Sequence, residues 1–500
     1  MKKLLALLLV MVLAISLFAA CGGGPAQPTT VSSLTTSSNS GSSSDSGGGS
    51  ASASPASDNN NGRDGGTGAS APEMIWAAAF GGSDYDSFNA VCRDVDGYIA
   101  VGYSGEESFG NSDWEGVSVK GFDNGKYEGA DDGRRGGDAI IVKFDLNGEV
   151  VWKKSFGGAW SESFSAVCCD DDGYVAVGSN AQLYHGDWDW INLEGYGEFM
   201  VKFDKNGEVV WKKPFNGGGD FNAIIAVNDG YVTVGSSGAY NGSSYWDGQK
   251  TNGRDDGIIA KFDKNGDLLW NTSFGGSQYD EFLSLVEVSD GYVVVGNSEE
   301  ESFESGDWEG VPGKGRYDAI IVKFDFSGNV LWKKSFGGSG NDSFGSVTQS
   351  SDGCVVVGYS RKESFENGDW DSVSSNGEDH AIMVKYDANG NVVWKKVFGE
   401  DFEASLTSVI ADGDGFVAAG AIASFVAAEA TIVRFDANGN VIWQKSFGGY
   451  GRDYFTSITP GVDGGYVASI FLSEVTLENH SDFEKTVKNG ATDGVIMKLG

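Results

Sequence analysis

Cysteine, proline and histidine are scarce in this chain of 500 residues, which contains 5 Cys, 7 Pro and 3 His. The three histidines, His185, His380 and His480, fall in different stretches of the sequence, and no CxxC pair accompanies them. No Ser/Cys-His-acid phrase, HExxH motif or phosphate-binding loop is present either. These absences argue against a zinc site and against the common catalytic constellations, so we expect a protein that is not an enzyme.

Positive charge is also in short supply. The 35 Lys and Arg residues face 71 Asp and Glu residues, which gives a formal net charge of −36. The acidic residues are spread along the whole chain, and such a chain is repelled by nucleic acid and by an anionic lipid surface. We therefore expect no nucleic-acid partner. The charge is compatible with calcium or cationic partners, although solubility alone would also explain it.

An apolar run of limited length lies at the N-terminus. Lys2 and Lys3 precede it, it covers residues 4–18, and the small pair Ala19-Ala20 follows it. This order predicts a signal peptide over residues 1–20, because the run is too short for a stable membrane span. The phrase LFAAC, which ends at Cys21, resembles the lipobox of bacterial lipoproteins, apart from Phe18, where that family more often has a smaller or aliphatic residue. The resemblance implies that Cys21 carries a lipid anchor in the cell envelope. The alternative is plain secretion with an unmodified Cys21.

Residues 21–72 consist almost entirely of Gly, Ser, Ala, Thr, Asn and Pro. A segment of this composition cannot bury enough apolar surface to offset the entropy of its chain. We therefore expect a flexible linker that holds a folded region, residues 73–500, away from the bilayer.

Internal repetition is the strongest feature of the sequence. A phrase of the form VVWKKSFGG recurs seven times, at the tryptophans Trp76, Trp152, Trp211, Trp270, Trp332, Trp394 and Trp443. Within the fifth unit, four β-rich runs can be recognised at 344–347, 355–360, 381–386 and 392–398. Asp-Gly and Asn-Gly pairs between these runs supply the positive-φ residues that hairpin turns require. Four antiparallel strands repeated seven times predict an all-β protein, a seven-bladed β-propeller.

The stretch DAIIVKFDLNGEVVWKKSFGG from Asp138, followed by DGYVAVG, resembles the SBBP repeat, the seven-bladed β-propeller repeat of bacterial secreted proteins. The resemblance covers residues 74–500, and it implies a fold without implying a ligand, because the motif residues serve turns and core. The chain opens with the fourth strand of a blade (74–80) and ends with the third (494–499). We expect these two segments to pair and to complete the seventh blade, which removes two exposed strand edges.

Four cysteines lie in the repeats: Cys92, Cys168, Cys169 and Cys354. Cys92 and Cys168 hold the same position in successive repeats, SFNAVC and SFSAVC. Equivalent sites in neighbouring blades are expected to lie too far apart for a disulfide. We interpret all four as small buried apolar residues.

Strand parity places the Asp-Gly and Asn-Gly hairpins on one face and the Gly-Gly links and long insertions on the other. The face with the insertions is the candidate binding face, because binding residues concentrate on loops held by a rigid scaffold. The candidate ligand-binding residues in these insertions are Trp114, Trp188, Trp246, Trp308 and Trp370, with Asp113, Asp187, Asp307 and Asp369. Exposed rings beside carboxylates would suit a glycan, a peptide or a cationic group. Alternatively, each Trp forms the core of its own loop.

A second set of acids lies in the links between repeats: Asp86, Glu162, Asp280, Asp342 and Asp453. These carboxylates either line a calcium site or accept backbone N–H bonds from their glycine-rich turns. No cofactor is indicated, and calcium is the metal that such oxygen ligands would suit.

Together these features predict a lipid-anchored, surface-displayed monomer that acts as a binding or interaction module for a glycan, a peptide or a protein. One alternative is a structural scaffold of the envelope with no small ligand. A less favoured alternative is a glycoside hydrolase that uses two of the many carboxylates.

Overall fold

The structure is a computed structural model, and it describes residues 70–120, 136–158, 160–180, 186–188, 197–215, 218–238, 245–246, 249–375, 377–399, 403–423, 428–448, 451–473, 483 and 492–500. The expected signal peptide, Cys21 and the linker up to residue 69 lie outside the described residues. Within these ranges no helix has both the length and the hydrophobicity needed to cross a lipid bilayer.

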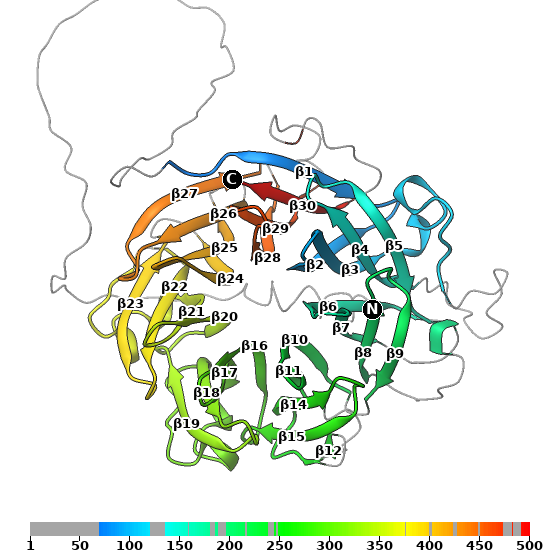
Figure 1. Ribbon diagram of the computed structural model, residues 1–500. Coiled ribbons are helices and arrows are strands. Elements are labelled where there is room, and N and C mark those ends of the chain that lie inside the picture. The colour runs from blue at the N-terminus through cyan, green and yellow to red at the C-terminus, as the bar shows by residue number, and fades with distance from the viewer. Residues whose placement is uncertain are drawn as a thin grey trace, which may run out of the picture. The chain divides into compact units, whose positions relative to one another are not determined.

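The blades are seven four-stranded antiparallel sheets, as the sequence predicts. Figure 1 shows them arranged in a ring, with the first strand of each blade innermost and the fourth outermost. Blades 1 and 2 consist of β2 (Asp86–Arg93), β3 (Gly97–Ser104), β4 (Asp138–Asp145), β5 (Val150–Phe156), β6 (Glu162–Cys169), β7 (Gly173–Asn180), β8 (Gly197–Asp204) and β9 (Val209–Pro214). Blades 3 and 4 consist of β10 (Asp220–Val227), β11 (Gly230–Ser236), β14 (Gly257–Asp263), β15 (Leu268–Phe274), β16 (Asp280–Val288), β17 (Gly291–Glu299), β18 (Tyr317–Phe324) and β19 (Val330–Phe336).

The remaining blades have the same order of strands. Blades 5 and 6 consist of β20 (Asp342–Ser350), β21 (Gly353–Arg361), β22 (Asp379–Asp387), β23 (Val392–Phe398), β24 (Ala404–Asp412), β25 (Gly415–Ala423), β26 (Ala428–Phe435) and β27 (Val441–Phe447). Blade 7 consists of β28 (Tyr454–Pro460), β29 (Tyr466–Phe471), β30 (Gly494–Leu499) and β1 (Met74–Phe80). A short extra ribbon, β12 (Tyr245–Trp246) with β13 (Gln249–Lys250), lies in the insertion of blade 3.

Blade 7 closes the ring by joining the two ends of the chain. β1 pairs antiparallel with β30, from Met74 opposite Leu499 to Phe80 opposite Gly494. Glu73 and Gly500 exchange two further backbone hydrogen bonds, of 3.2 and 3.0 Å. The prediction that the two chain ends complete one blade is therefore confirmed.

Apolar side chains fill the boundary between each pair of neighbouring blades. Middle strands are covered on both faces, so β4 is buried from Asp138 to Phe144. The repeated tryptophan of a fourth strand reaches across the boundary, as Trp76 Nε1 does to the carbonyl oxygen of Leu146 at 3.0 Å. That carbonyl belongs to an Asn-Gly hairpin whose Gly148 has φ 83°, and a Cβ there would lie 2.7 Å from the Trp76 ring. The Trp and the Asn-Gly pair of the repeat thus fit one another in neighbouring blades.

The two ends of the propeller differ as strand parity predicts. Asp86 at the start of β2 lies opposite Ser104 at the end of β3, and Ser104 lies opposite Asp138 at the start of β4. The links and insertions therefore share one end, which we call the loop end. The Asp-Gly and Asn-Gly turns share the other, which we call the hairpin end.

A disulfide between Cys92 and Cys169 joins blades 1 and 2 at the hairpin end, with the two Cα atoms 6.3 Å apart. The interpretation of all four cysteines as small buried apolar residues was wrong for this disulfide-bonded pair, whereas Cys168 and Cys354 are free and buried. The expectation compared Cys92 with its repeat equivalent Cys168, which packs in the core between blades 2 and 3. Because side chains alternate along a strand, the next residue, Cys169, points back toward blade 1. A stable disulfide is typical of an oxidising compartment, so it indicates an extracytoplasmic location.

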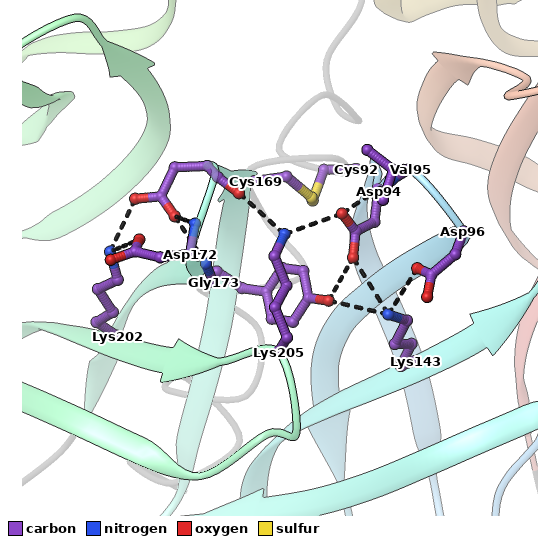
Figure 2. A network of polar contacts seen from close by, with 12 residues as sticks. Cys92, Asp94, Val95, Asp96, Lys143, Cys169, Asp172, Gly173, Lys202 and Lys205 are labelled. Carbon is purple, nitrogen blue, oxygen red and sulfur yellow. Dashed lines mark hydrogen bonds and ion pairs between the residues drawn. A yellow bond between two sulfur atoms is a disulfide. The ribbon is translucent and has the colours of Figure 1, made fainter.

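Polar contacts surround the disulfide (Figure 2). The buried carboxylate of Asp94 in blade 1 accepts a hydrogen bond from the Tyr174 hydroxyl of blade 2 at 2.5 Å. It also receives the ammonium groups of Lys143 at 3.2 Å and Lys205 at 2.9 Å. These donors hold the pKa of Asp94 well below its usual range despite its burial. Blades 1 and 2 are thus joined by a covalent bond and an ionic network together.

Replacing Cys92 and Cys169 by Ser is expected to lower the free energy of unfolding by about 2–4 kcal/mol, because the bond closes a long loop between residues with a sequence separation of 77. Thermal denaturation with and without a reductant measures the effect. Reductant should lower the melting temperature of the wild type and leave that of the double variant unchanged. A wild-type melting temperature that does not change when reductant is added would contradict the stabilising role of the disulfide.

Candidate functional site

The aspartate-tryptophan motifs of the insertions form short 3-10 turns at the loop end. These turns are η2 (Ser112–Trp114), η3 (Gly186–Trp188), η6 (Gly306–Trp308) and η8 (Gly368–Trp370). In each turn the indole is 0% exposed and packs edge-on against the phenylalanine of the preceding repeat phrase. Trp308, for example, lies 4.8 Å from Phe274 between ring centroids.

The prediction that these rings contact a ligand is therefore wrong for Trp114, Trp188, Trp308 and Trp370. They are anchors that fix the insertions to the propeller, which is the alternative that the sequence left open. The side chain of Trp246 lies outside what the structure describes. Phe483, which holds the aromatic position in the insertion of blade 7, is also fully buried.

The neighbouring aspartates are structural as well. The carboxylates of Asp113, Asp187, Asp307 and Asp369 each accept the backbone N–H of the first link glycine, at 2.9–3.2 Å. The backbone N–H of each aspartate donates to the carbonyl oxygen of the same glycine. A lysine of the next outer strand, such as Lys333 below Asp307, donates to the aspartate carbonyl. Each insertion is thus held at three points, which makes the loop end rigid near the blades.

The link acids accept backbone N–H bonds, which is one of the two roles that the sequence allowed. Asp86 accepts the N–H of Gly82 at 2.8 Å, and Glu162 accepts that of Gly158 at 3.0 Å. A Cβ on Gly81 would lie 2.7 Å from oxygens of both Asp86 and Asp493, so the repeat phrase requires glycine at this point. Among the described residues no group of three His, Cys, Asp or Glu side chains could hold a metal ion.

Burial raises the pKa of four of these carboxyl groups, Asp86, Glu162, Asp280 and Asp342. It raises the pKa of Asp86, Asp280 and Asp342 to about 6, against the opposing effect of the N–H and hydroxyl donors. It raises the pKa of Asp318 to about 7 and that of Asp138 to about 8, where fewer donors offset it. In the unfolded chain these groups have pKa values near 4.

Stability is therefore expected to fall as the pH rises from about 5.5 to about 8.5. Across this window the folded protein binds protons that the unfolded chain has already released, and it loses them as the pH passes the folded pKa values. The melting temperature at constant ionic strength should fall by several degrees. The variant Asp318→Asn should show a flatter profile, and a wild-type melting temperature that rises over this range would contradict the assignment.

A different set of side chains remains accessible at the loop end, around the inner strands. We call it the axial rim, and its aromatic members are half-buried residues of the links and strand ends. They are Tyr85, Tyr103, Tyr279, Tyr317, Tyr359, Tyr454 and Phe471. Sequence analysis missed this set because it followed motifs that recur. The position before the link acid changes from repeat to repeat instead, from Tyr85 to Ser161, Tyr279, Asn341 and Arg452.

One part of the axial rim, in blades 7 and 1, is an aromatic cluster. The rings of Tyr454 and Phe471 stack with 5.0 Å between centroids and 18° between planes. Tyr85 lies 6.1 Å from Phe471 and 6.2 Å from Tyr103. Burial raises the pKa of Tyr103 to about 12, with a smaller contribution from the nearby Asp84, so its hydroxyl stays a neutral donor. We call these four residues the aromatic sector.

A second part, in blades 3 and 4, combines tyrosine with arginine. The guanidinium of Arg254 lies 4.4 Å from the ring centroid of Tyr279. Burial raises the pKa of the Tyr317 hydroxyl, the nearby Glu299 carboxylate raises it further, and the charges of Arg316 and Arg254 oppose this rise. We call Arg254, Tyr279, Arg316 and Tyr317 the arginine sector. The inner strands of the two sectors, β28 and β2 on one side and β16 on the other, lie across the ring from each other (Figure 1).

Histidine adds no exposed group to the rim in the part of the chain that the structure describes. His380 is completely buried and contacts Ser375. His185 and His480 lie outside the described residues.

Comparison with known proteins gives a family resemblance over part of the chain. Residues 137–358, less than half of the chain, match the family model of the outer membrane protein assembly factor BamB. A curated relative, the regulatory protein FlaEY of Caulobacter vibrioides, is 26% identical over 185 residues, which span 36% of this chain and 19% of that protein. The chain thus matches less than a fifth of that relative. The matching family model is not the SBBP repeat, which remains a resemblance.

Solved structures resemble the chain only distantly. The Pan2 WD40 domain of Neurospora crassa is 9% identical, with 82% of this chain and 89% of that chain covered and a TM-score of 0.43. The hydrazine synthase of Kuenenia stuttgartiensis is 10% identical, with 78% and 93% covered and a TM-score of 0.44. The chain is a β-propeller repeat protein that is similar, over residues 137–358, to the BamB family.

Proposed function

We propose that this protein is an extracytoplasmic interaction module that binds a segment of another protein across the axial rim. The observation that carries the proposal is the accessible aromatic sector of Tyr85, Tyr103, Tyr454 and Phe471, which faces the arginine sector across the ring. Tyrosine and arginine are enriched at the energetic centres of protein interfaces. Rings that already stack on one another lose little conformational freedom on binding.

The surrounding loops support the proposal because they are rigid where they meet the blades. Each described aspartate-tryptophan turn is held by a buried indole, by a link glycine and by a lysine of the next strand. A ligand at the rim would therefore meet a preformed surface, which lowers the entropic cost of binding.

Large exposed apolar side chains offer a second surface, at the hairpin end. Most of them begin the outermost strands: Ile75, Val150, Val151, Val209, Val210, Leu269, Val330, Leu331, Val392, Val393 and Val441. They recur in every blade, and in five of the seven blades one or two lysines follow on the same strand and protect the exposed edge from pairing. A surface that is the same in each blade gives a partner no unique orientation, so we favour the rim.

Selection from a displayed library of random peptides, with a glycan array in parallel, tests the proposal. The full mature protein should enrich peptides that contain aromatic or aliphatic residues. The double variant Tyr85→Ala/Tyr454→Ala should lose this enrichment, whereas Val151→Ala/Val210→Ala at the hairpin end should keep it. If the protein bound glycans and no peptide, the ligand would be a carbohydrate and not a protein segment. Binding of neither would favour a scaffold without a peptide-like ligand.

The lipid anchor is part of the same proposal, since it would hold the module at the membrane. Cys21→Ser should abolish labelling with a radioactive or clickable fatty acid, and it should release the protein or leave an uncleaved precursor. Cys354→Ala is the matched control, because that thiol is buried in the propeller, and it should retain the label. A label that persists in Cys21→Ser would contradict the anchor.

A further inference from the structure

The arginine sector contains two arginines at equivalent positions of neighbouring blades. Arg254 and Arg316 each stand two residues before a buried aspartate at the N-terminal end of the third strand, Asp256 immediately before β14 and Asp318 within β18. Both arginine side chains are exposed. The equivalent position before the third strand of blade 5, two residues ahead of His380, holds Glu378 instead, so the arginines are not a general requirement of the repeat.

Neither arginine forms an ion pair with a carboxylate within the ranges that the structure describes. Other arginines of the propeller do, since Arg361 lies 3.3 Å from Asp379 and Arg434 lies 2.8 Å from Asp412. The contrast matters in a chain of net charge −36, where carboxylates are available almost everywhere. The two guanidinium groups are left with their fork of N–H donors accessible.

The neighbouring tyrosines orient these donors. Arg254 rests on the face of Tyr279 at 4.4 Å, a contact that restrains the guanidinium without using its N–H groups. Tyr317 follows Arg316 directly and adds a hydroxyl whose pKa is raised by burial, so it remains a neutral donor. The sector therefore offers a restrained set of donors with a positive charge, which suits a planar oxyanion.

We propose that Arg254 and Arg316, with Tyr279 and Tyr317, form a carboxylate-recognition subsite that selects acidic segments of the partner protein. This inference rests on the proposed function, and it names the partner's chemistry. An isolated Asp or Glu side chain, or a C-terminal carboxylate, fits two arginines. An extended polyanion would be repelled by the rest of the protein, whose charge is strongly negative.

Peptide selection on arginine variants tests the subsite. Peptides enriched by the wild-type protein should contain Asp or Glu in addition to apolar residues. Arg254→Gln/Arg316→Gln should select peptides without acidic enrichment, and it should bind a wild-type-selected acidic peptide at least about tenfold more weakly. Added salt should weaken that peptide's binding to the wild type much more than its binding to the variant.

Lys362→Gln is the control, because it removes another exposed positive charge at the loop end, one that is paired with Glu378 at 3.3 Å, and it should behave as the wild type. Both arginines are exposed, so the double variant should keep the wild-type melting temperature. Wild-type peptides without acidic enrichment, or acidic enrichment that survives in the double variant, would overturn the subsite and leave the proposed function standing. Anionic glycans bound by the wild type and lost in the variant would overturn the protein partner. If the wild type bound neither a peptide nor a glycan, the proposed function itself would be overturned.

Discussion

Removal of residues 494–500 is expected to prevent the propeller from folding. The deletion takes away β30, the strand that pairs with β29 on one side and with β1 on the other. Every residue of β30 is buried, including Val495, Ile496, Met497 and Leu499. Each such side chain contributes about 1.5–3 kcal/mol through burial, and their sum is comparable to the whole stability of an ordinary protein, about 5–15 kcal/mol.

Two further variants of the chain distinguish ring closure from a general sensitivity to truncation. Deleting residues 25–60, which precede the described residues, should leave the melting temperature almost unchanged. A circular permutant that joins Gly500 to Glu73 through an Asn-Gly turn and opens the chain between β4 and β5 should fold, because the strands still pair. A soluble, cooperatively unfolding protein that lacks residues 494–500 would contradict this account of closure.

Replacement of Trp308 by Ala is expected to cost about 3–5 kcal/mol, the usual penalty for removing a large aromatic side chain from a packed core. Trp308 is completely buried, lies 4.8 Å from Phe274 and 5.0 Å from Phe303, and donates its Nε1–H to Asp280 at 2.7 Å. Its loss would leave a cavity and deprive a buried carboxylate of one donor. Urea denaturation measures the change in the free energy of unfolding.

Trp211→Ala is the matched control, since that indole lies on an outer strand, is partly exposed, and donates to the Lys264 carbonyl oxygen at 3.2 Å. Its cost should be about 1–2 kcal/mol. Hydrogen exchange should also show that Trp308→Ala exposes the amide of Asp307, which normally donates to Gly275. Equal, small costs for the two variants would restore the view that Trp308 is a surface residue.

The fold could be predicted from the sequence because the same strand and turn signals recur in every repeat. The Asn-Gly pair fixes a hairpin, the β-branched runs fix strands, and the two unmatched segments 74–80 and 494–499 fix the closure. Parity then assigns every connection to one of the two ends. None of these inferences depends on where a particular side chain points.

The candidate site could not be predicted in the same way, because it depends on side-chain direction. The sequence left open whether Trp308 and Asp307 are exposed or buried, because the partners that bury them, the N–H of the glycine link and the ring of Phe274, come from another part of the repeat. Cys169 differs from Cys168 by a single step along the strand, and that step decides which blade it faces. The axial rim could not be found from the repeats because its residues differ from one repeat to the next.

Site-specific photocrosslinking in cells of the native host tests the central claim most directly. A photoreactive amino acid at Tyr85 or Tyr317 on the axial rim is compared with one at Val151 or Val210 on the hairpin end, with expression and melting temperature matched. The account predicts a discrete crosslinked protein from both rim positions and none from the hairpin end, and it predicts that Arg254→Gln/Arg316→Gln weakens the crosslink. A crosslinked partner that appears only from Val151 or Val210 would contradict the assignment of the axial rim as the binding site.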